Sequence, residues 1–197
     1  MVNFMPLSGS GSATRYGENP SGQDGMRVRA ARFVSDEYAI DTLGLSISEG
    51  RNFSADERII GDVEPNTPSV AIVSRSFIEQ IFPDENGLGK TIYDGNAPFK
   101  VVGIVETMKG PWLSDAQVAN MVISPTVSAN ANQTILVRTK PGERAAVMRE
   151  IEEKLLNAYN KRVIYGIQGM DTAKAEHTAQ DLLMLRMLVT LIVVLLL

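Results

Sequence analysis

The chain has 197 residues, 44% of them hydrophobic, with 19 basic and 23 acidic residues giving a net charge of −4. This composition is that of a folded protein with a substantial core, and the interspersed charges exclude a basic nucleic-acid-binding surface. No cysteine is present, which excludes disulfides, a thiol nucleophile and thiolate metal sites.

The N-terminal third predicts a loop, a strand and a short helix. Residues 8–25 are rich in turn formers and lack apolar periodicity, which indicates a mobile loop. Residues 27–34 alternate as a half-exposed strand does. Asp36 then stands where it can cap a short helix that Gly44 ends.

The middle of the chain predicts a strand, a helix and two further strands. Residues 69–73 are a compact apolar strand, and Ser74 is a natural N-cap for the helix that follows. That helix carries four apolar residues at helical spacing, which we interpret as core and not as an aromatic binding box: Phe77, Ile78, Ile81 and Phe82. The further strands are residues 99–107 and 118–123, and Gly103 in the first marks a bulge or the close approach of another backbone.

The stretch PDENGLGKTI, residues 83–92, resembles the end of a phosphate-binding loop. Such a loop needs a glycine where this chain has Asp84, and it follows a strand, whereas this stretch follows a predicted helix. We therefore interpret it as a turn between a helix and a strand, with Gly87 and Gly89 available for positive φ and Lys90 solvated. No nucleotide or other cofactor is predicted.

The last third predicts a βαβ unit with a right-handed crossover. Its parts are a strand at 133–139, a helix at 141–160 and a strand at 162–170. Along the helix, Val147 and Leu155 share one apolar face with Ile151.

The C-terminus changes sharply in composition. Residues 187–197 are uncharged and almost wholly apolar, and a helix-compatible stretch leads into them without a breaker. The run is shorter than the about 20 residues that cross a bilayer. We interpret it as the first turns of a transmembrane helix that continues beyond Leu197, with Arg186 near the membrane interface. A buried terminal helix of a soluble domain is the other interpretation.

Catalytic and metal-binding residues are few. His177 is the only histidine, so a triad or a histidine metal site must include it. Asp171 and Asp181 are near in sequence, but an exposed helical histidine is the interpretation we favour. The acidic pairs Asp56–Glu57 and 84–85 lie in polar loops, which indicates ordinary surface charges. We predict no catalytic residue and no metal site.

Taken together, the chain resembles the MacB-like periplasmic core domain of ABC transporter permeases, a module of the FtsX-like permease group. The resemblance is carried by EYAIDTLGLSISEGRNFS with Gly50, Arg51 and Phe53, by VAIVSRSFIEQIFPDENGLGKTI, and by FKVVGIVETMKG. PLSGSGS upstream and the predicted βαβ unit extend it over most of the chain. The family usually has Asp-Pro where this chain has Asn86 and Gly87, which changes how the turn is made.

The resemblance implies a two-lobed α+β fold. One porter-like lobe would combine residues 1–54 and 128–175, and an inserted β-rich lobe would span 55–127. A stalk helix at 176–197 would lead into the truncated transmembrane helix. Family members carry a transmembrane helix on each side of the domain, so we expect the chain to begin after the first one, which also explains the absence of a secretion signal.

The resemblance also implies a function without enzymatic activity in this chain. The domain would lie on the periplasmic side of the inner membrane and couple cytoplasmic ATP hydrolysis to export or mechanical work. The implied partners are an ABC ATPase domain or subunit, a second permease in a homodimer or heterodimer, a periplasmic adaptor protein, and the membrane. The alternative is a soluble ligand-binding or hydrolytic α+β domain with a hydrophobic terminal helix, in which His177 with Asp171 or Asp181 would supply the polar groups.

Overall fold

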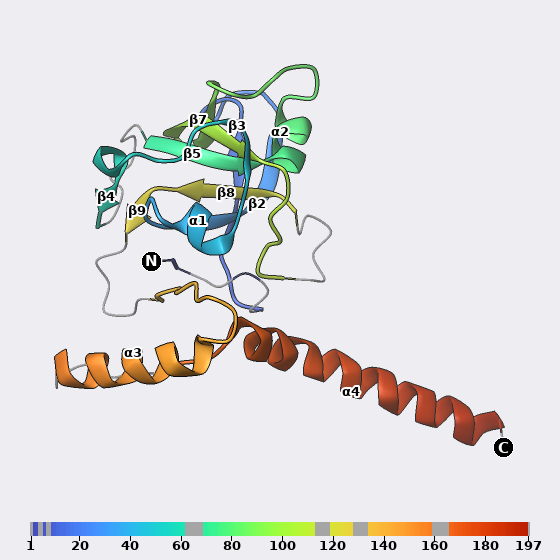
Figure 1. Cartoon of the computed structure of the whole chain (residues 1–197). Helices are drawn as coiled ribbons and strands as arrows, with labels where there is room; N and C mark the ends of the chain where they lie inside the picture. The colour runs from blue at the N-terminus through green and yellow to red at the C-terminus, as the bar shows by residue number, and fades with distance from the viewer. Residues whose placement is uncertain are drawn as a thin grey trace. The chain divides into compact units, whose positions relative to one another are not determined.

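Strands dominate the first two thirds of the computed structural model and helices the last third (Figure 1). The structure describes residues 2–3, 6, 9–61, 69–112, 119–127, 134–158 and 166–196. Contacts divide the chain into unit 1, residues 1–137, and unit 2, residues 138–197. The fold is therefore a mixture of sheet and helix, as the α+β prediction requires.

The elements of unit 1 are mostly short strands. They are β1 (Ala13–Gly17), β2 (Arg27–Val34), α1 (Ala39–Leu43), β3 (Ile47–Gly50), the 3₁₀ turn η1 (Ala55–Glu57), β4 (Ile59–Ile60), β5 (Ser69–Ser74), α2 (Arg75–Ile81), β6 (Thr91–Asp94), β7 (Ala97–Val105), β8 (Met121–Ser124) and β9 (Thr126–Val127). Unit 2 holds α3 (Arg144–Ala158) and α4 (Met170–Leu196).

Seven strands form one sheet in the order β3-β7-β5-β8-β2-β1-β6. The sheet closes on itself, because β6 pairs antiparallel with β1 and also with β7. A ring of six strands results, and β3 is added along the second half of β7. Closure removes most of the open edges that an unpaired strand would expose.

Two hydrophobic clusters lie on opposite faces of this sheet. Phe77, Ile78 and Ile81 of α2 pack on the first face, where the Tyr16 and Phe77 rings meet edge to face with centroids 5.8 Å apart. Ile40 of α1 and Phe53 belong to the second cluster, against the other face of the strands. The strands are therefore buried on both sides, and α1 and α2 are fixed relative to the sheet.

Several expectations from the sequence are confirmed in unit 1. The predicted strands at 27–34, 69–73 and 99–107 correspond to β2, β5 and β7. Gly44 ends α1 in the left-handed conformation, with φ 69°. A Cβ on Gly103 would lie 2.5 Å from the carbonyl oxygen of Arg51, so the predicted close approach of another backbone is also present.

Other expectations are wrong in detail. The predicted loop at 8–25 contains β1, because five of its residues pair in register with β2. Ser74 takes the extended backbone of an N-cap but makes no capping bond, since its Oγ accepts the N–H of Met121 at 2.9 Å. The predicted strand at 118–123 begins later, at Met121.

Unit 2 departs furthest from the prediction. The helix expected at 141–160 is present as α3, but the two flanking strands of the βαβ unit are not found in the described residues. The segment 134–140 makes only an isolated bridge between Thr134 and Val2, and 166–169 form no strand. Residues 162–165 of the second strand lie outside the described part. A strand needs a partner for its backbone groups, and no described segment pairs with residues 135–140.

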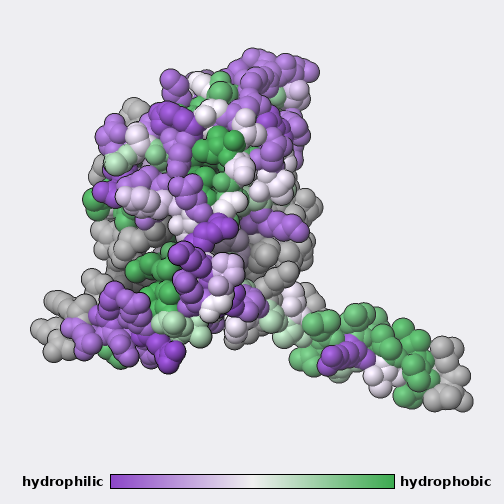
Figure 2. Space-filling model, in the orientation of Figure 1, coloured by the Kyte–Doolittle hydropathy of each residue, from purple (hydrophilic) through white to green (hydrophobic). Residues whose placement is uncertain are grey.

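The C-terminal helix α4 is continuous over 27 residues, as the unbroken helical pattern predicts. Leu188, Ile192 and Leu195 illustrate its exposed apolar side chains, with 46–76% of each accessible. Figure 2 shows apolar residues over most of the visible face of this helix. Within the described residues, no helix meets the combined requirement of length and apolar content for crossing a membrane.

The predicted lobe boundaries remain a prediction. The closed sheet combines β1, β2 and β3, from the range 1–54, with β5 to β8, from the range 55–127. Strands from both predicted lobes thus pair directly in unit 1.

Candidate functional site

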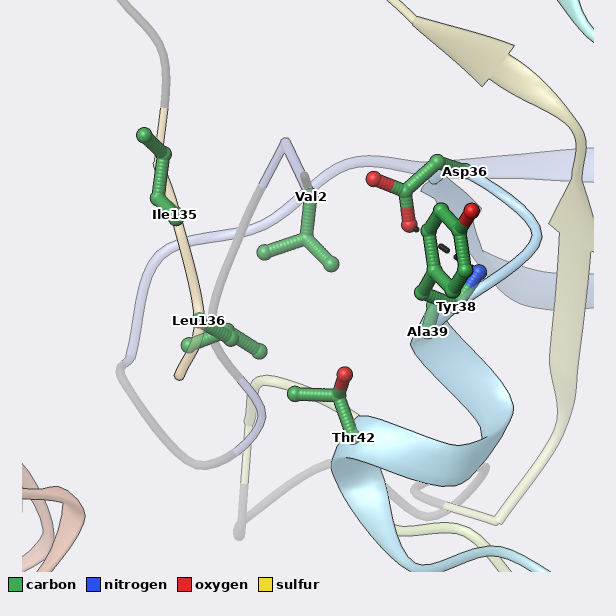
Figure 3. A pocket seen from close by; sticks show the side chains of 7 residues that line it. All are labelled: Val2, Asp36, Tyr38, Ala39, Thr42, Ile135 and Leu136. Carbon is green, nitrogen blue, oxygen red and sulfur yellow. Dashed lines mark hydrogen bonds between the residues drawn. The ribbon is translucent and has the colours of Figure 1, made fainter. Parts of the chain in front are cut away.

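A hollow of about 220 Å³ opens on unit 1 beside α1 (Figure 3). Val2, Thr42 and Leu136 face one another across it. The described residues that line it are Val2, Asp36, Tyr38, Ala39, Thr42, Ile135 and Leu136. These residues come from three segments that are distant in the sequence, so the tertiary fold creates the hollow.

Local hydrogen bonds hold the walls of the hollow in place. The Asp36 carboxylate accepts the backbone N–H of Tyr38 at 3.3 Å, an Asx turn that starts the chain into α1. Val2 donates its N–H to the carbonyl of Thr134 at 3.0 Å. Asn3 fixes the same segment to β2, since its side-chain oxygen accepts the N–H of Val34 at 3.0 Å. The first and last segments of unit 1 therefore meet at this site.

The lining is apolar with three polar groups. Val2 is buried, whereas Tyr38 is 64% exposed and Ile135 is 56% exposed. The polar groups are a carboxylate, a phenol hydroxyl and the hydroxyl of Thr42. Among its described lining residues there is no histidine, cysteine or lysine, so these residues do not pair an activated nucleophile with a base.

A second polar cluster surrounds Arg75 at the start of α2. Its guanidinium pairs with Glu49 at 2.7 Å and with Glu106 at 2.9 Å, and it donates to Ser48 at 3.1 Å. Hydrogen bonds from Arg75 lower the pKa of both carboxyls below their usual range. The cluster ties α2 to β3 and to the end of β7. Every charged side chain of the cluster has a partner within it, so we assign it a structural role.

The motif residues Gly50, Arg51 and Phe53 are also structural. Gly50 has φ 80°, and a Cβ there would lie 2.2 Å from the carbonyl oxygen of Val102. Arg51 donates to both carboxylate oxygens of Glu57, at 2.8 and 2.6 Å. Phe53 is buried in the second hydrophobic cluster. The motif thus holds the connection between β3 and η1 close against β7.

Glu57 completes a capping box at η1. Its carboxylate accepts the N–H of Ser54 at 3.0 Å as well as the hydrogen bonds from Arg51. The Arg51 hydrogen bonds are the largest cause that lowers the pKa of Glu57 from 4.5 to about 2. The expectation that Glu57 is an ordinary surface charge is therefore wrong, whereas its neighbour Asp56 is exposed as predicted.

The phosphate-loop look-alike at 83–92 is a turn, as predicted. It follows α2 and leads into β6. Gly89 has φ 80°, but Gly87 does not take positive φ, since its role is close packing: a Cβ there would lie 2.5 Å from Ile78. Lys90 is not simply solvated, because its amine pairs with Glu85 and lies 4.7 Å from the centre of the Phe82 ring.

The few catalytic candidates are not brought together in the described residues. Asp171, in the first turn of α4, pairs with Arg144 at 2.7 Å, and this hydrogen bond lowers the pKa of Asp171. The side chains of His177 and Asp181 lie outside the described part. Across the described ranges, no three His, Cys, Asp or Glu side chains are placed to hold a metal ion.

The hollow was not predicted as a site. Asp36 stood out in the sequence only as a helix cap, and residues 135–136 only as part of a strand. A sequence pattern gives the local role of each residue, but not the distant segments that meet it. The signal that was available is the short apolar run Ile135–Val137, which indicates an extended segment but not what it contacts.

Comparisons with known proteins agree on one family. The model of the MacB-like periplasmic core domain matches residues 3–154. The chain is 25% identical over 146 residues to the macrolide export ATP-binding/permease protein MacB of Aggregatibacter actinomycetemcomitans, covering 72% of this chain and 22% of that protein. It is 28% identical over 118 residues to MacB 2 of Aeromonas hydrophila subsp. hydrophila, covering 57% and 17%.

Among solved structures, two transporter domains align with part of this chain. The periplasmic region of MacB from Actinobacillus actinomycetemcomitans aligns with a TM-score of 0.49 at 18% identity, over 78% of this chain and 66% of that chain. The extracellular domain of the ABC-type transporter YknZ from Gram-positive bacteria aligns with a TM-score of 0.41 at 14% identity, over 59% and 51%. Against the two curated relatives, the chain spans 22% and 17% of the full length.

Proposed function

Because the chain belongs to the MacB-like periplasmic core domain family, we propose that it is the extracytoplasmic domain of an ABC transporter permease. In this proposal the domain couples ATP hydrolysis in the cytoplasm to export, or to mechanical work on a cargo or periplasmic partner. The observation that carries the proposal is the family match over residues 3–154, which includes nearly all of the closed sheet and both hydrophobic clusters.

ATP hydrolysis is assigned to another domain or subunit. The curated relatives are named as ATP-binding/permease proteins, and this chain covers no more than about a quarter of any of the three. The turn at residues 83–92 does not supply a phosphate site, since Lys90 is paired with Glu85. The proposed partners are an ABC ATPase, a second permease in a homodimer or heterodimer, and a periplasmic adaptor.

The proposed location is the inner membrane, with unit 1 on the periplasmic side. Two lobes would divide the domain at residues 1–54 with 128–175 and at 55–127, and residues 176–197 would form the stalk. The exposed apolar side chains of α4 support a membrane-proximal position, because a helix that is apolar around its circumference is stable when buried in protein or lipid. An α-helix extends about 1.5 Å per residue along its axis. A stiff helix of this kind also transmits a displacement from one of its ends to the other.

Site-specific labelling tests the location. The chain contains no cysteine. In the parent protein, after any cysteines elsewhere have been replaced, Asp24→Cys therefore provides a single thiol on the exposed β1–β2 connection. We expect a membrane-impermeant maleimide to label it in intact spheroplasts. Labelling that requires lysis of the spheroplasts contradicts the periplasmic location.

Purification tests the transporter assignment. We expect the parent protein, extracted in mild detergent, to carry an ATPase domain with a complete Walker A sequence or to co-purify with a subunit that has one. A parent reading frame with no membrane span and no associated ATPase would overturn the proposal.

A further inference from the structure

The turn between α2 and β6 contains the dipeptide Asn86–Gly87, and no other asparagine of the chain precedes a glycine. An asparagine side chain reacts most readily with the backbone nitrogen of a following glycine, because glycine has no Cβ to hinder the approach. Asn86 and the residues at 83–85 are exposed, so water reaches this part of the turn. The pair therefore has the sequence and the solvent access that deamidation requires.

Two hydrogen bonds hold the side-chain amide of Asn86. Its Oδ1 accepts the backbone N–H of Leu88 at 3.0 Å. A donor at this oxygen favours the negative charge that develops there when a nucleophile attacks the amide carbon. Its Nδ2 donates to Oε2 of Glu49, in β3, at 2.7 Å, and this bond has to break before the nitrogen leaves as ammonia. One contact thus assists the reaction, and the other opposes it.

The carboxylate of Glu49 is itself fixed in position. Its Oε1 pairs with Arg75 at 2.7 Å, and Arg75 also pairs with Glu106 at 2.9 Å. Hydrogen bonds from Arg75 and then from Asn86 lower the pKa of Glu49, so the carboxylate stays ionised at neutral pH. Asn86 therefore leaves this acceptor only when the turn opens locally, and the frequency of that opening limits the reaction.

Gly87 is buried, whereas Asn86 and Leu88 on either side of it are exposed. A Cβ on Gly87 would lie 2.5 Å from Ile78 of α2, and the Gly87 carbonyl oxygen accepts the N–H of Lys90 at 3.2 Å. Gly87 is thus packed closely against α2. A product with a longer backbone, such as isoaspartate, displaces it from these contacts.

We propose that Asn86 is a deamidation site, that its hydrogen bond to Glu49 slows the reaction, and that conversion releases the turn from β3. In the reaction, the backbone nitrogen of Gly87 bonds to Cγ of Asn86 while the bond from Cγ to Nδ2 breaks. Ammonia leaves with both hydrogens of the side-chain amide and the hydrogen of the Gly87 N–H. Water then opens the cyclic imide at either carbonyl, which gives aspartate or isoaspartate. This chemistry does not depend on the parent protein being a transporter, so the inference goes beyond the proposed function.

Conversion changes the contact with Glu49 from attraction to repulsion. Both products lack the donor that Asn86 supplies, and both place a second carboxylate next to that of Glu49. Two like charges at such a short distance repel each other. The deamidated chain is therefore expected to hold the turn less firmly against β3.

Mass spectrometry of the folded 197-residue chain, kept in mild detergent, measures the reaction. The chain is incubated at neutral and at mildly alkaline pH, and trypsin then releases residues 76–90 by cleavage after Arg75 and Lys90. An unincubated sample digested in parallel gives the background. We expect Asn86 to gain the mass difference between an amide and an acid faster at the higher pH, because the attacking nitrogen has to lose its proton. Asn96, which is exposed and precedes an alanine, is expected to convert more slowly.

Two carboxylate variants show whether Glu49 controls the rate. Glu49→Ala removes the acceptor and is expected to speed the conversion of Asn86 about fivefold, which is the effect of one lost hydrogen bond. Glu106→Ala is the matched control, because Glu106 also pairs with Arg75 but is not a hydrogen-bond partner of Asn86 in the described residues. This control is expected to leave the rate unchanged.

A double-mutant cycle tests the consequence for stability. Asn86→Asp reproduces one product and is expected to lower the ratio of folded to unfolded chain about fivefold. In a Glu49→Gln background, which removes the opposing charge, the same substitution is expected to cost less. Asn96→Asp is the control, since its cost is expected to be the same in both backgrounds. Urea unfolding followed by near-ultraviolet circular dichroism measures each change.

Any of three results contradicts the proposal. The first is conversion of Asn86 no faster than that of Asn96 in a chain whose circular dichroism is native. The second is equal acceleration, or none, by Glu49→Ala and Glu106→Ala, which would mean that the Glu49 contact does not control the rate. The third is an equal cost of Asn86→Asp in both backgrounds, which would mean that the charge of the product does not act on Glu49.

Discussion

Unit 1 and unit 2 bury their apolar residues to very different extents. All buried residues of the described chain lie before Val137, in the two clusters around the closed sheet and beside them. In unit 2, the apolar residues of α4 from Leu182 to Leu195 are exposed, and so is Leu156 of α3. Folding is driven by removing apolar surface from water. Unit 1 therefore contains its own source of stability in its two clusters, whereas the side chains of α4 from Leu182 to Leu195 bury little apolar surface.

The largest expected effect is the loss of a core ring in unit 1. Phe77 is fully buried and meets Tyr16 edge to face. Phe77→Ala removes that packing and leaves a cavity, which is expected to cost about 3–5 kcal/mol of unfolding free energy. Urea unfolding followed by near-ultraviolet circular dichroism measures it.

Leu188→Ala in α4 is the matched control for this prediction. Leu188 is 55% exposed, so its truncation is expected to leave the urea midpoint of unit 1 unchanged. If the two variants lose similar amounts of stability, the difference in burial between the two units does not govern their energetics, and the comparison fails.

The second-largest loss of stability is expected where two backbone segments of unit 1 approach each other closely, at Gly50. Gly50 and Gly89 both have φ 80°, but a Cβ on Gly50 would meet the Val102 carbonyl oxygen at 2.2 Å, whereas a Cβ on Gly89 would meet nothing within 4 Å. Gly89→Ala is expected to cost about 1–2 kcal/mol through positive φ alone. Gly50→Ala is expected to cost a further about 1–3 kcal/mol for the clash.

Thermal or urea unfolding of the two glycine variants separates the cost of the positive φ from the cost of the steric clash with Val102. The difference between them isolates the clash, because both pay the same conformational cost. Equal losses for Gly50→Ala and Gly89→Ala would mean that the β3–β7 contact relaxes freely, so that the motif glycine is needed only for its conformation.

The same contrast shows how far the sequence predicts this fold. The strands at 27–34, 69–73 and 99–107 were predictable because their apolar pattern is satisfied within unit 1. The predicted role of Gly103 is also confirmed, since a glycine inside a strand commonly marks a bulge or a close backbone approach. By contrast, β1 lies in a segment rich in turn formers, and only its register with β2 makes it a strand.

The predictions that failed share a dependence on contacts between distant segments. The βαβ unit was inferred from local periodicity, but residues 135–140 find no strand partner in the described chain. Lys90 and Glu57 were expected to be solvated, yet Glu85 and Arg51 pair with them. The hollow depends on Val2, Thr42 and residues 135–136 meeting in space, and no local pattern in the sequence specifies that meeting.

The third prediction concerns the ion pair between Arg51 and Glu57 in unit 1, whose contribution to stability depends on pH. The pKa of Glu57 is lowered from 4.5 to about 2, chiefly by hydrogen bonds from Arg51. A carboxyl with a depressed pKa contributes stability that is fully present above its unfolded pKa and is lost as the pH falls through the folded value. Glu57→Gln is therefore expected to reduce stability by about 1 kcal/mol at pH 7, the upper range for a pair near the surface.

The difference between Glu57→Gln and the wild type is expected to shrink between pH 4.5 and pH 2, because the Glu57 carboxyl binds a proton in the unfolded chain near pH 4.5 but in the folded chain only near pH 2. Urea titrations at pH 7, 4.5 and 2.5 follow it. A difference that stays constant down to pH 2.5 would assign the effect to the shape of the side chain and not to its charge.

The smallest effect is expected for the corresponding ion pair of unit 2. Arg144 and Asp171 are joined at 2.7 Å, but their side chains are 54% and 66% exposed, whereas the Glu57 side chain is only 18% exposed. Solvent and salt screen such a pair, and double-mutant measurements of exposed pairs often find almost nothing. Arg144→Gln is therefore expected to leave the helical circular dichroism and its thermal loss unchanged. If it instead melts α3 or α4, this pair organises unit 2, and the two units would differ in the kind of interaction that stabilises them as well as in burial.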